Sequence, residues 1–308
     1  MNKKAIFYTA AAIALSVMII FTYSAFQSIR LNDRMDVVQT RVETMNFFIG
    51  DVEKDLEKGA FIAGFRSLLA FNQHIASNGT FIDDPNAQFK EVFLNGTLDG
   101  QPLGLMYAST FTDWANKIRT ESGKVDIIFD FEVVDVQLNQ TDPWDVDINL
   151  DINLDIRDRK NTSYWVRQNH LVTRVSILDF EDPLYLVNSN GLVTNTIRIS
   201  NITEFVQNGV VDNLLYHMNN SYYIAHPDAP SYIMRLKGDT GNSTYGIESL
   251  VNLEEFQAQG LVLKDRSIVD YIYFGSQVTT NFRINNTPSW FKIDSGHLDT
   301  YQVTNITI

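Results

Sequence analysis

The sequence predicts an α+β fold in which an N-terminal transmembrane helix continues into an amphipathic stalk helix, followed by a mostly antiparallel β-sheet ectodomain with short helices. Three observations predict it. Residues 5–29 carry no charge, and about 20 apolar helical residues suffice to cross a bilayer core of about 30 Å. Residues 31–56 repeat apolar side chains at heptad spacing, which is typical of a helix that packs along one face. Residues 146–157 alternate apolar and polar side chains, as half-buried strands do.

These features divide the chain into three parts. Residues 1–29 are the predicted cytoplasmic tip and transmembrane helix, 30–70 the stalk and 71–308 the ectodomain, with a further boundary near 180–200 as an alternative. A content of 44% hydrophobic and 12% aromatic residues excludes a disordered chain. A net charge of −13 argues against nucleic acid as a partner, because phosphates require clustered Lys and Arg.

The stalk is predicted from a seam of apolar residues spaced alternately four and three positions apart, the pattern of a coiled coil. The positions beside the seam carry too few opposite charges to specify the pairing of identical parallel helices. Two partners for the seam therefore stay open: other copies of the chain, in a homo-oligomer or filament, and the chain's own ectodomain. The seam consists of Leu31, Met35, Val38, Val42, Met45, Ile49, Val52 and Leu56.

Beyond the stalk, the first elements follow from local signals. Asp84 followed by Pro85 predicts the start of a short helix, since Asp is a favoured N-cap and Pro suits the first helical position. A second helix is expected over 110–122. Apolar alternation then predicts three strands that form an antiparallel meander. These strands are expected at 125–134, 146–157 and 164–178.

The remainder of the chain predicts short elements separated by proline and glycine loops. We expect a hairpin formed by 185–187 and 192–199, and a helix capped by Asn201 or Thr203 that runs to Met218. Asn252 should cap a helix that ends at Gly260. Further strands are expected at 222–224, 231–236, 246–251 and 267–274.

No motif in the sequence predicts a reaction. The chain has no cysteine, and its five histidines lack the spacing of the usual zinc motifs. P-loop, dinucleotide and nucleophile-elbow signatures are also absent. We therefore predict no catalytic residue, no cofactor and no metal site, and a protein that is not an enzyme. The histidines are His74, His170, His217, His226 and His297.

An acidic cluster lies on the second predicted strand and the turn before it. Alternating Asp on a strand is first of all a solvated face, which also blocks edge-to-edge aggregation. Ca²⁺ is the weaker alternative, because carboxylates are its preferred ligands, although the spacing is not that of an EF-hand loop. The cluster consists of Asp142, Asp145, Asp147, Asp151 and Asp155.

Nine N-x-S/T sequons follow the predicted span, and none precedes it. Because this motif is the acceptor of N-glycosylation, the pattern predicts a cell-membrane, single-pass protein whose C-terminal domain is extracellular. A cleaved secretory signal is less well supported, since no small-x-small site stands at Ala25. The candidate glycosylation sites are Asn78, Asn95, Asn139, Asn161, Asn201, Asn219, Asn242, Asn285 and Asn305.

A short Lys-bearing leader, an apolar helix that passes into an amphipathic one and a β-rich head together resemble archaeal type IV pilin-like proteins, over about residues 1–60. The resemblance implies removal of the leader near Lys4-Ala5-Ile6 and packing of the helix with its copies in a filament core. Ala10 stands where the family often has an acidic residue, and the head is large. The chain therefore looks more like a minor or tip subunit, and it is also similar to single-pass archaeal surface proteins.

Together these features predict a membrane-anchored extracellular structural or interaction protein, in a surface filament or envelope assembly. The alternative is a tethered ectodomain that binds a ligand or acts as an enzyme of unknown class. A pocket with convergent polar groups would favour that alternative, because ligand binding and catalysis require one.

Overall fold

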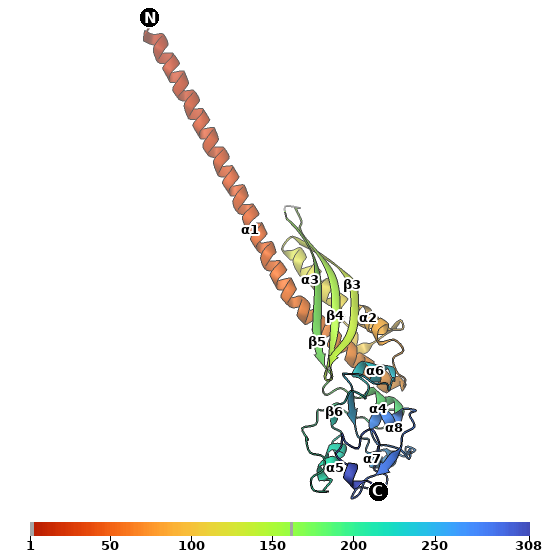
Figure 1. Ribbon diagram of the computed structural model, residues 1–308. Coiled ribbons are helices and arrows are strands. Elements are labelled where there is room, and N and C mark those ends of the chain that lie inside the picture. Colours follow the sequence, from red (N-terminus) through yellow and green to blue (C-terminus); the bar gives the residue numbers. More distant parts are fainter. Residues whose placement is uncertain (1–2, 161–162) are drawn as a thin grey trace. The chain divides into compact units, whose positions relative to one another are not determined.

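The computed structural model describes residues 3–160 and 163–308, and within the first helix it describes the side chains of 12–27, 35 and 37 onward. The fold is α+β, as predicted (Figure 1). The chain forms two compact units: Met1–Asp55 with Ile118–Asp130 and Asp155–Val166, and Leu56–Lys117 with Phe131–Leu154 and Arg167–Ile308.

The first element, α1 (Lys3–Asn78), is a single helix of 76 residues. No proline occurs before Pro85, so no residue lacks the backbone N–H that each turn requires. The helix passes through the predicted boundary between span and stalk at residue 29 without a break.

The prediction of a transmembrane helix is wrong. In the described part of the chain, no helix is both long enough and apolar enough to cross a membrane. The prediction rests on the absence of charge in residues 5–29, but a run without charge is not by itself a span, which needs about 20 consecutive, predominantly apolar residues. The single-pass topology, the cytoplasmic tip, the cell-membrane localisation and the extracellular placement of the C-terminal domain depend on that helix and are corrected with it.

The main sheet has three strands in the order β3-β4-β5, and two residues connect β3 to β4, which makes that pair an antiparallel hairpin. The strands are β3 (Ile127–Asp142), β4 (Asp145–Asp158) and β5 (Tyr164–Ser176). The predicted alternation in the central strand is confirmed, since its apolar side chains are fully buried. These are Val146, Ile148, Leu150, Ile152, Leu154 and Ile156.

Within the second unit, helices cover one face of this sheet. They are the last turns of α1, α2 (Pro85–Asn95) and the first turns of α3 (Phe111–Lys124). Asp84 caps α2 as predicted, because its side chain accepts hydrogen bonds from the backbone N–H groups of Asn86 and Ala87. A chain of ring contacts joins the layers, with centroids 5.1–6.3 Å apart. It runs through Phe71, Phe89, Phe93, Phe111 and Phe131.

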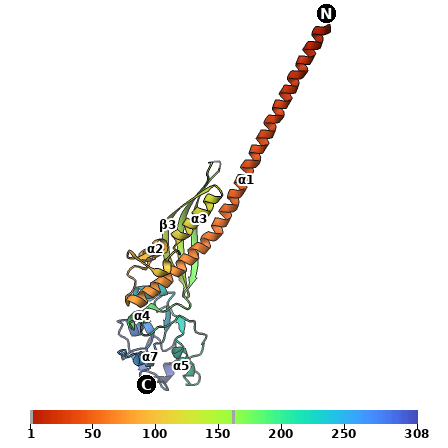
Figure 2. The same cartoon turned by 180° about the vertical axis from the view of Figure 1, so that it is seen from behind.

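The rest of the second unit surrounds an apolar core of its own with short elements. Figures 1 and 2 show α4, α5 and α7 in this part, with the C-terminus beside them. Its helices are α4 (Pro183–Asn188), α5 (Asp212–Asn219), α6 (Tyr232–Lys237), α7 (Leu253–Ala258) and α8 (Asp270–Phe274). Its short strands are β6 (Tyr223–Ala225), β7 (Ile247–Ser249), β8 (Asn281–Arg283) and β9 (Lys292–Asp294). Two short strands, β1 (Thr97–Leu98) and β2 (Gln101–Pro102), follow α2, and 3₁₀ turns lie at Gly104–Met106 and Thr304–Ile306.

Several predicted strands in this part are helices instead. The segments 185–187, 231–236 and 267–274 contain α4, α6 and α8. Asp182 and Ser231 each accept a hydrogen bond from a backbone N–H in the first helical turn, so they act as N-caps that favour helix over the β-prone residues that follow. The helix predicted from residue 203 begins only at Asp212, because Gln207 and Val210 first close a tight turn with Gly209 at φ +80°. Asn252 caps α7 as predicted.

Candidate functional site

The predicted seam divides into a closed half and an open half. The closed half, which consists of Met45, Ile49, Val52 and Leu56, is 2–7% exposed and packs on the chain itself. The open half, which consists of Met35, Val38 and Val42, is 40–67% exposed, while Leu31 lies outside the described side chains. Of the two partners that the sequence left open, the chain itself is therefore the partner of the closed half, and a partner for the open half stays a prediction.

Contacts inside the first unit fix the closed half. The ring of Phe48 meets Phe129 of β3 edge-on, with centroids 6.4 Å apart, and Ser163 donates a hydrogen bond to the sulfur of Met45. At the N-terminal edge of this contact, the Arg41 guanidinium lies 3.0 Å from the carboxylate of Asp158. The aromatic contact and the ion pair hold α1 against the sheet from residue 41 onward.

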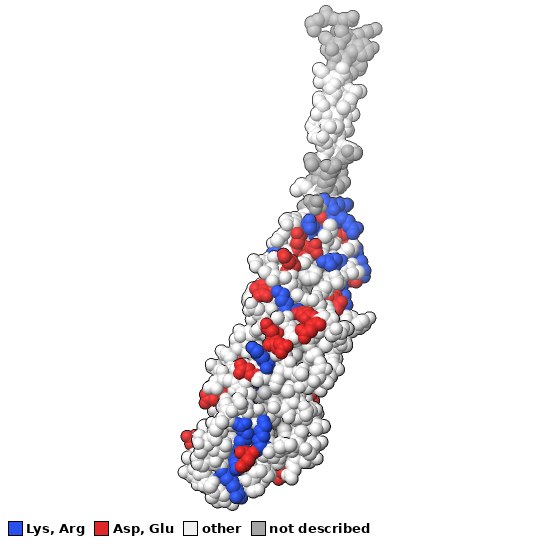
Figure 3. All heavy atoms as spheres, turned by 90° about the vertical axis from the view of Figure 1, so that its right-hand side faces the viewer, with Lys and Arg blue, Asp and Glu red and all other residues white. Residues whose placement is uncertain are grey.

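Residues 12–27, the exposed segment of α1, have an apolar surface on every side. All of them are exposed, and none carries a charge, so this stretch of the helix is free of red and blue in Figure 3. The hydroxyls of Ser16 and Thr22 donate hydrogen bonds to backbone carbonyls of the same helix. The large apolar side chains are Ile13, Leu15, Val17, Met18, Ile19, Ile20, Phe21, Tyr23 and Phe26, each 47–73% exposed.

A groove of about 460 Å³ lies in the first unit beside α1. Its charged groups are already paired, since Arg41 contacts both Asp158 and Asp126. A ligand would have to displace these ion pairs, so the groove does not by itself favour the ligand-binding alternative. It is lined by Val37, Thr40, Arg41, Thr44, Met45, Lys124, Val125, Asp126, Ile127 and Asp158.

Three of the five carboxylates of the acidic cluster have a basic side chain beside them. Asp147 lies 2.9 Å from Arg174, and although burial raises its pKa, hydrogen bonds from Arg174 and Thr141 lower that pKa below its usual range. Asp151 lies 2.8 Å from His170 of β5, and Asp155 lies 2.9 Å from Arg157. The contacts of Asp147 and Asp151 join β4 to β5, and such cross-strand pairs favour a stabilised polar face over a Ca²⁺ site.

The sequon residues are placed where a glycan could be attached. Eight of the nine Asn side chains are exposed, and Asn161 lies outside the described residues. Exposure is a requirement for modification, and the use of these sites stays a prediction.

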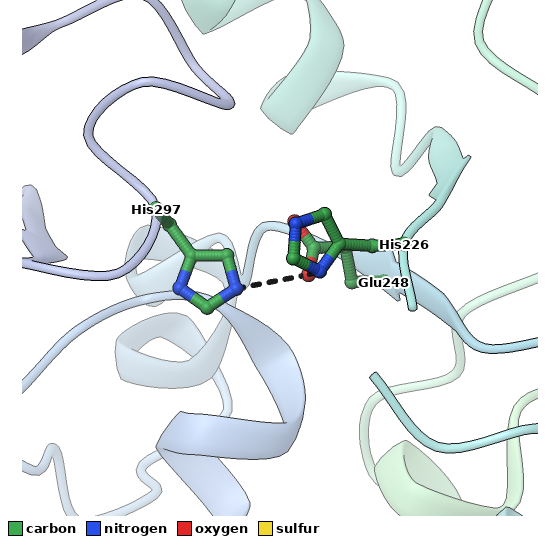
Figure 4. Close-up of side chains that lie close together, drawn as sticks. All are labelled: His226, Glu248 and His297. Carbon is green, nitrogen blue, oxygen red and sulfur yellow. Dashed lines mark ion pairs between the residues drawn. The ribbon is translucent and has the colours of Figure 1, made fainter. Parts of the chain in front are cut away.

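Three side chains that the sequence left scattered converge in the second unit. His226 follows β6, Glu248 lies in β7 and His297 lies in the turn after β9, and Figure 4 shows both imidazoles facing the carboxylate. The Glu248 Oε2 atom lies 3.2 Å from Nε2 of His297 and 3.4 Å from Nδ1 of His226. One ligand atom from each residue lies within 4.8 Å of the other two. We call these three residues the triad.

Further residues orient the triad. Asp294 accepts a hydrogen bond from Nδ1 of His297 at 2.8 Å, and Tyr301 donates to Oε1 of Glu248 at 2.9 Å. Burial lowers the pKa of His297, but the Asp294 and Glu248 carboxylates beside its two ring nitrogens outweigh burial and raise the pKa to about 10. The site therefore favours a positive charge between the carboxylates of Asp294 and Glu248.

The spacing of the histidines in the sequence does not indicate that His226 and His297 lie close together in the fold. They are 71 residues apart in sequence (297 − 226), and strand pairing of β6 with β7 brings Glu248 between them. A motif search cannot find such a site, because no two of its ligands share a helix or a short loop. The other three histidines lie elsewhere: His74 contacts Asn78 on α1, His170 contacts Asp151, and His217 is buried in α5.

The comparisons with known proteins give no relative: no protein-family model, curated protein or solved structure matches this chain. The resemblance to pilin-like proteins stays a prediction.

Proposed function

We propose that the protein is a non-enzymatic structural subunit that assembles with copies of itself through the exposed segment and the open half of the seam. The observation that carries this proposal is the uncharged, fully exposed surface of residues 12–27. A helix that is apolar on all sides is stable only when it is covered on all sides. Large exposed apolar patches mark interaction sites.

The size of the surface supports a stable interface. Sixteen helical residues (12–27) form a cylinder roughly 24 Å long and about 10 Å across, with a side area of roughly 750 Å². This area is close to the ~800 Å² that each partner contributes to a specific protein interface. Because one neighbouring helix covers only one side, the proposed assembly contains three or more copies.

A copy of the same chain is the partner that fits this surface. With no charge on residues 12–27, the segment offers nothing that selects a charged partner. In a parallel bundle the exposed segment lies against its own copies, and the heptad spacing of Met35, Val38 and Val42 continues the same contact. An antiparallel partner that covers the exposed segment would leave the open halves of the two seams at opposite ends of the contact.

Substitution of the open half of the seam tests this assembly. The double variant Val38→Asp with Val42→Asp should dissociate the oligomer of the full chain, because each buried, unpaired carboxylate costs several kcal/mol. Its thermal unfolding should change little, since both side chains are 40–46% exposed and lie outside the closed half. The measurement is molar mass by sedimentation velocity together with a thermal melt.

Two single variants serve as controls. Phe47→Asp changes an apolar side chain that is 75% exposed, at a position about 180° around the helix from Val38, and should leave the oligomer intact. Ile49→Asp places a charge in the closed half, so it should lower the melting temperature. A monomeric wild-type chain, or equal effects of the seam variant and Phe47→Asp, would contradict the proposal.

A further inference from the structure

We propose that His226, Glu248 and His297 form a structural site for one divalent transition-metal ion, with Zn²⁺ as the ion that fits best. Two imidazole nitrogens and one carboxylate oxygen are a donor set that zinc takes in proteins. The ion would supply a cross-link between three segments of the second unit that are distant in sequence.

The distances between donor atoms fit a tetrahedral ion. Zinc binds His nitrogen and carboxylate oxygen at about 2.0–2.1 Å, so two adjacent donors of a tetrahedron lie about 3.3 Å apart. The two separations from Oε2 of Glu248 are 3.2 Å and 3.4 Å. Two edges of a coordination face thus already have the expected length, and all three donor atoms lie within 4.8 Å of one another. The fourth position would be taken by a water molecule or by the Tyr271 hydroxyl, which lies 2.9 Å from Nε2 of His297.

Unsatisfied polar atoms provide a second, independent observation. Oε2 of Glu248 and Nδ1 of His226 are buried and have no hydrogen-bond partner, although buried polar groups nearly always have one. The Glu248 side chain is completely buried, and the two atoms point at the same space. A metal ion at that point would satisfy both.

The surroundings have the features that support a metal ligand. A ligating His usually donates its second N–H to a carboxylate, and here Asp294 holds Nδ1 of His297 so that Nε2 faces the triad. Tyr301 holds the second oxygen of Glu248, and Thr300 lies 3.3 Å from Nε2 of His226. The His226 side chain is 16% exposed, and the other two are exposed by 5% or less. Such a closed site suits a structural ion rather than a catalytic one.

A metal cross-link at the triad would stabilise the fold of the second unit. The chain contains no cysteine, so no disulfide can stabilise the short elements around the second core. The ion would join the end of β6, strand β7 and the turn after β9. Because metal binding to the folded state alone stabilises that state, folding and binding are linked.

The test uses the full chain, stripped with EDTA and titrated with Zn²⁺. We expect one bound ion per chain by mass spectrometry of metal content, and a melting temperature raised by about 5 °C at a 100-fold excess over the dissociation constant. His226→Ala and Glu248→Gln should each abolish both effects. Asp294→Asn should weaken Zn²⁺ binding by about 10–100-fold.

His170→Ala is the matched control, since this exposed histidine also contacts a carboxylate but lies outside the triad, and it should bind Zn²⁺ as the wild type does. If Glu248→Gln fails to fold, His226→Ala decides the test, because His226 is the most exposed of the three. The proposal is overturned if the wild type binds no Zn²⁺, or if His226→Ala binds it as tightly as His170→Ala. Either result would mean that the triad is a hydrogen-bonded ion pair only.

Discussion

Arg235 is buried without any exposed surface in the second unit, where its guanidinium meets two carboxylates that are equally buried. It lies 2.5 Å from Asp182 and 2.9 Å from Asp270, and it also donates to the backbone carbonyl of Ile247. Because burial is the larger effect, the pKa of Asp182 is raised even though Arg235 opposes this rise. The arginine thus offsets the cost of two buried acids at the junction of α4, α6 and α8.

Removal of the Arg235 side chain should therefore strongly destabilise the folded chain. We expect Arg235→Leu to lower the free energy of unfolding by about 3–5 kcal/mol, since it leaves two buried carboxylates without a counter-charge. Arg283→Leu, at an exposed position, should change it by less than about 0.5 kcal/mol. The measurement is urea unfolding, and a triple variant that adds Asp182→Asn and Asp270→Asn should recover part of the loss. An Arg235→Leu chain as stable as Arg283→Leu would contradict this account.

His217 gives the protein a pH dependence of its own. Burial lowers its pKa to about 4 from an ordinary value of 6.5, because the imidazole is packed among Phe205, Tyr222 and Tyr301. The folded chain thus favours the neutral ring. The stability contributed by neutral His217 is complete above pH 6.5 and is lost as the pH falls from 6.5 to about 4.

The free energy of unfolding lost through protonation of His217 is about 3 kcal/mol at most. Urea unfolding midpoints of the wild type and of His217→Phe, measured at pH 7 and pH 4, check this prediction. The wild type should lose more stability than the variant over this interval, whereas His170→Ala should follow the wild type. Parallel curves for the wild type and His217→Phe would show that the buried imidazole does not carry the effect.

At the scale of elements, glycine has two different roles in α1. A Cβ atom on Gly59 would lie 2.8 Å from ring atoms of Trp114 in α3, whereas one on Gly50 would meet nothing within 4 Å. Gly59 therefore permits a close helix–helix contact in the second unit, and Gly50 has no such function. Sequence alone shows only that each glycine weakens the helix by about 1 kcal/mol relative to Ala.

The two glycines form a matched pair of substitutions. Gly50→Ala should stabilise the chain by up to about 1 kcal/mol, because it improves helix propensity without a clash. Gly59→Ala gains the same propensity but forces the Trp114 ring to move, which typically costs 1–3 kcal/mol. Thermal unfolding of both variants checks the prediction, and a Gly59→Ala chain that melts at or above the temperature of Gly50→Ala would contradict it.

The elements that were predicted correctly are those with local signals. The alternation of β4 and the cap of α2 each depend on residues within one element, so the sequence was sufficient. The same Asp-Pro signal that predicted α2 at Asp84 recurs at Asp182, but the β-prone residues 185–187 after it were interpreted as a strand, so α4 was missed. A consistent use of the cap rule would have found α4.

The triad could not be predicted from local signals. Its ligands come from the residue after β6, the middle of β7 and the turn after β9, and only the tertiary arrangement of the second unit brings these segments together. The seam could be predicted in part. Its heptad spacing was visible in the sequence, but the sequence did not show which seam residues the chain itself covers. That depends on the ion pair and the aromatic contact that begin at Arg41.

At the scale of the whole molecule, the central claim is that copies of the chain meet along the N-terminal part of α1. A single introduced cysteine tests this claim directly, because the chain has none of its own and a disulfide can then form only between copies. In a parallel, in-register bundle the same seam position of two copies lies side by side, and a disulfide requires this proximity, with Cβ atoms about 3.5–4.5 Å apart.

The measurement is the yield of covalent dimer under mild oxidation for Val42→Cys, Phe47→Cys and Val52→Cys. The account predicts efficient cross-linking for Val42→Cys, which is exposed on the seam, and little for Phe47→Cys on the other side of the helix or for Val52→Cys, which is buried against its own chain. No dimer from Val42→Cys, or equal yields from Val42→Cys and Phe47→Cys, would contradict assembly through this helix.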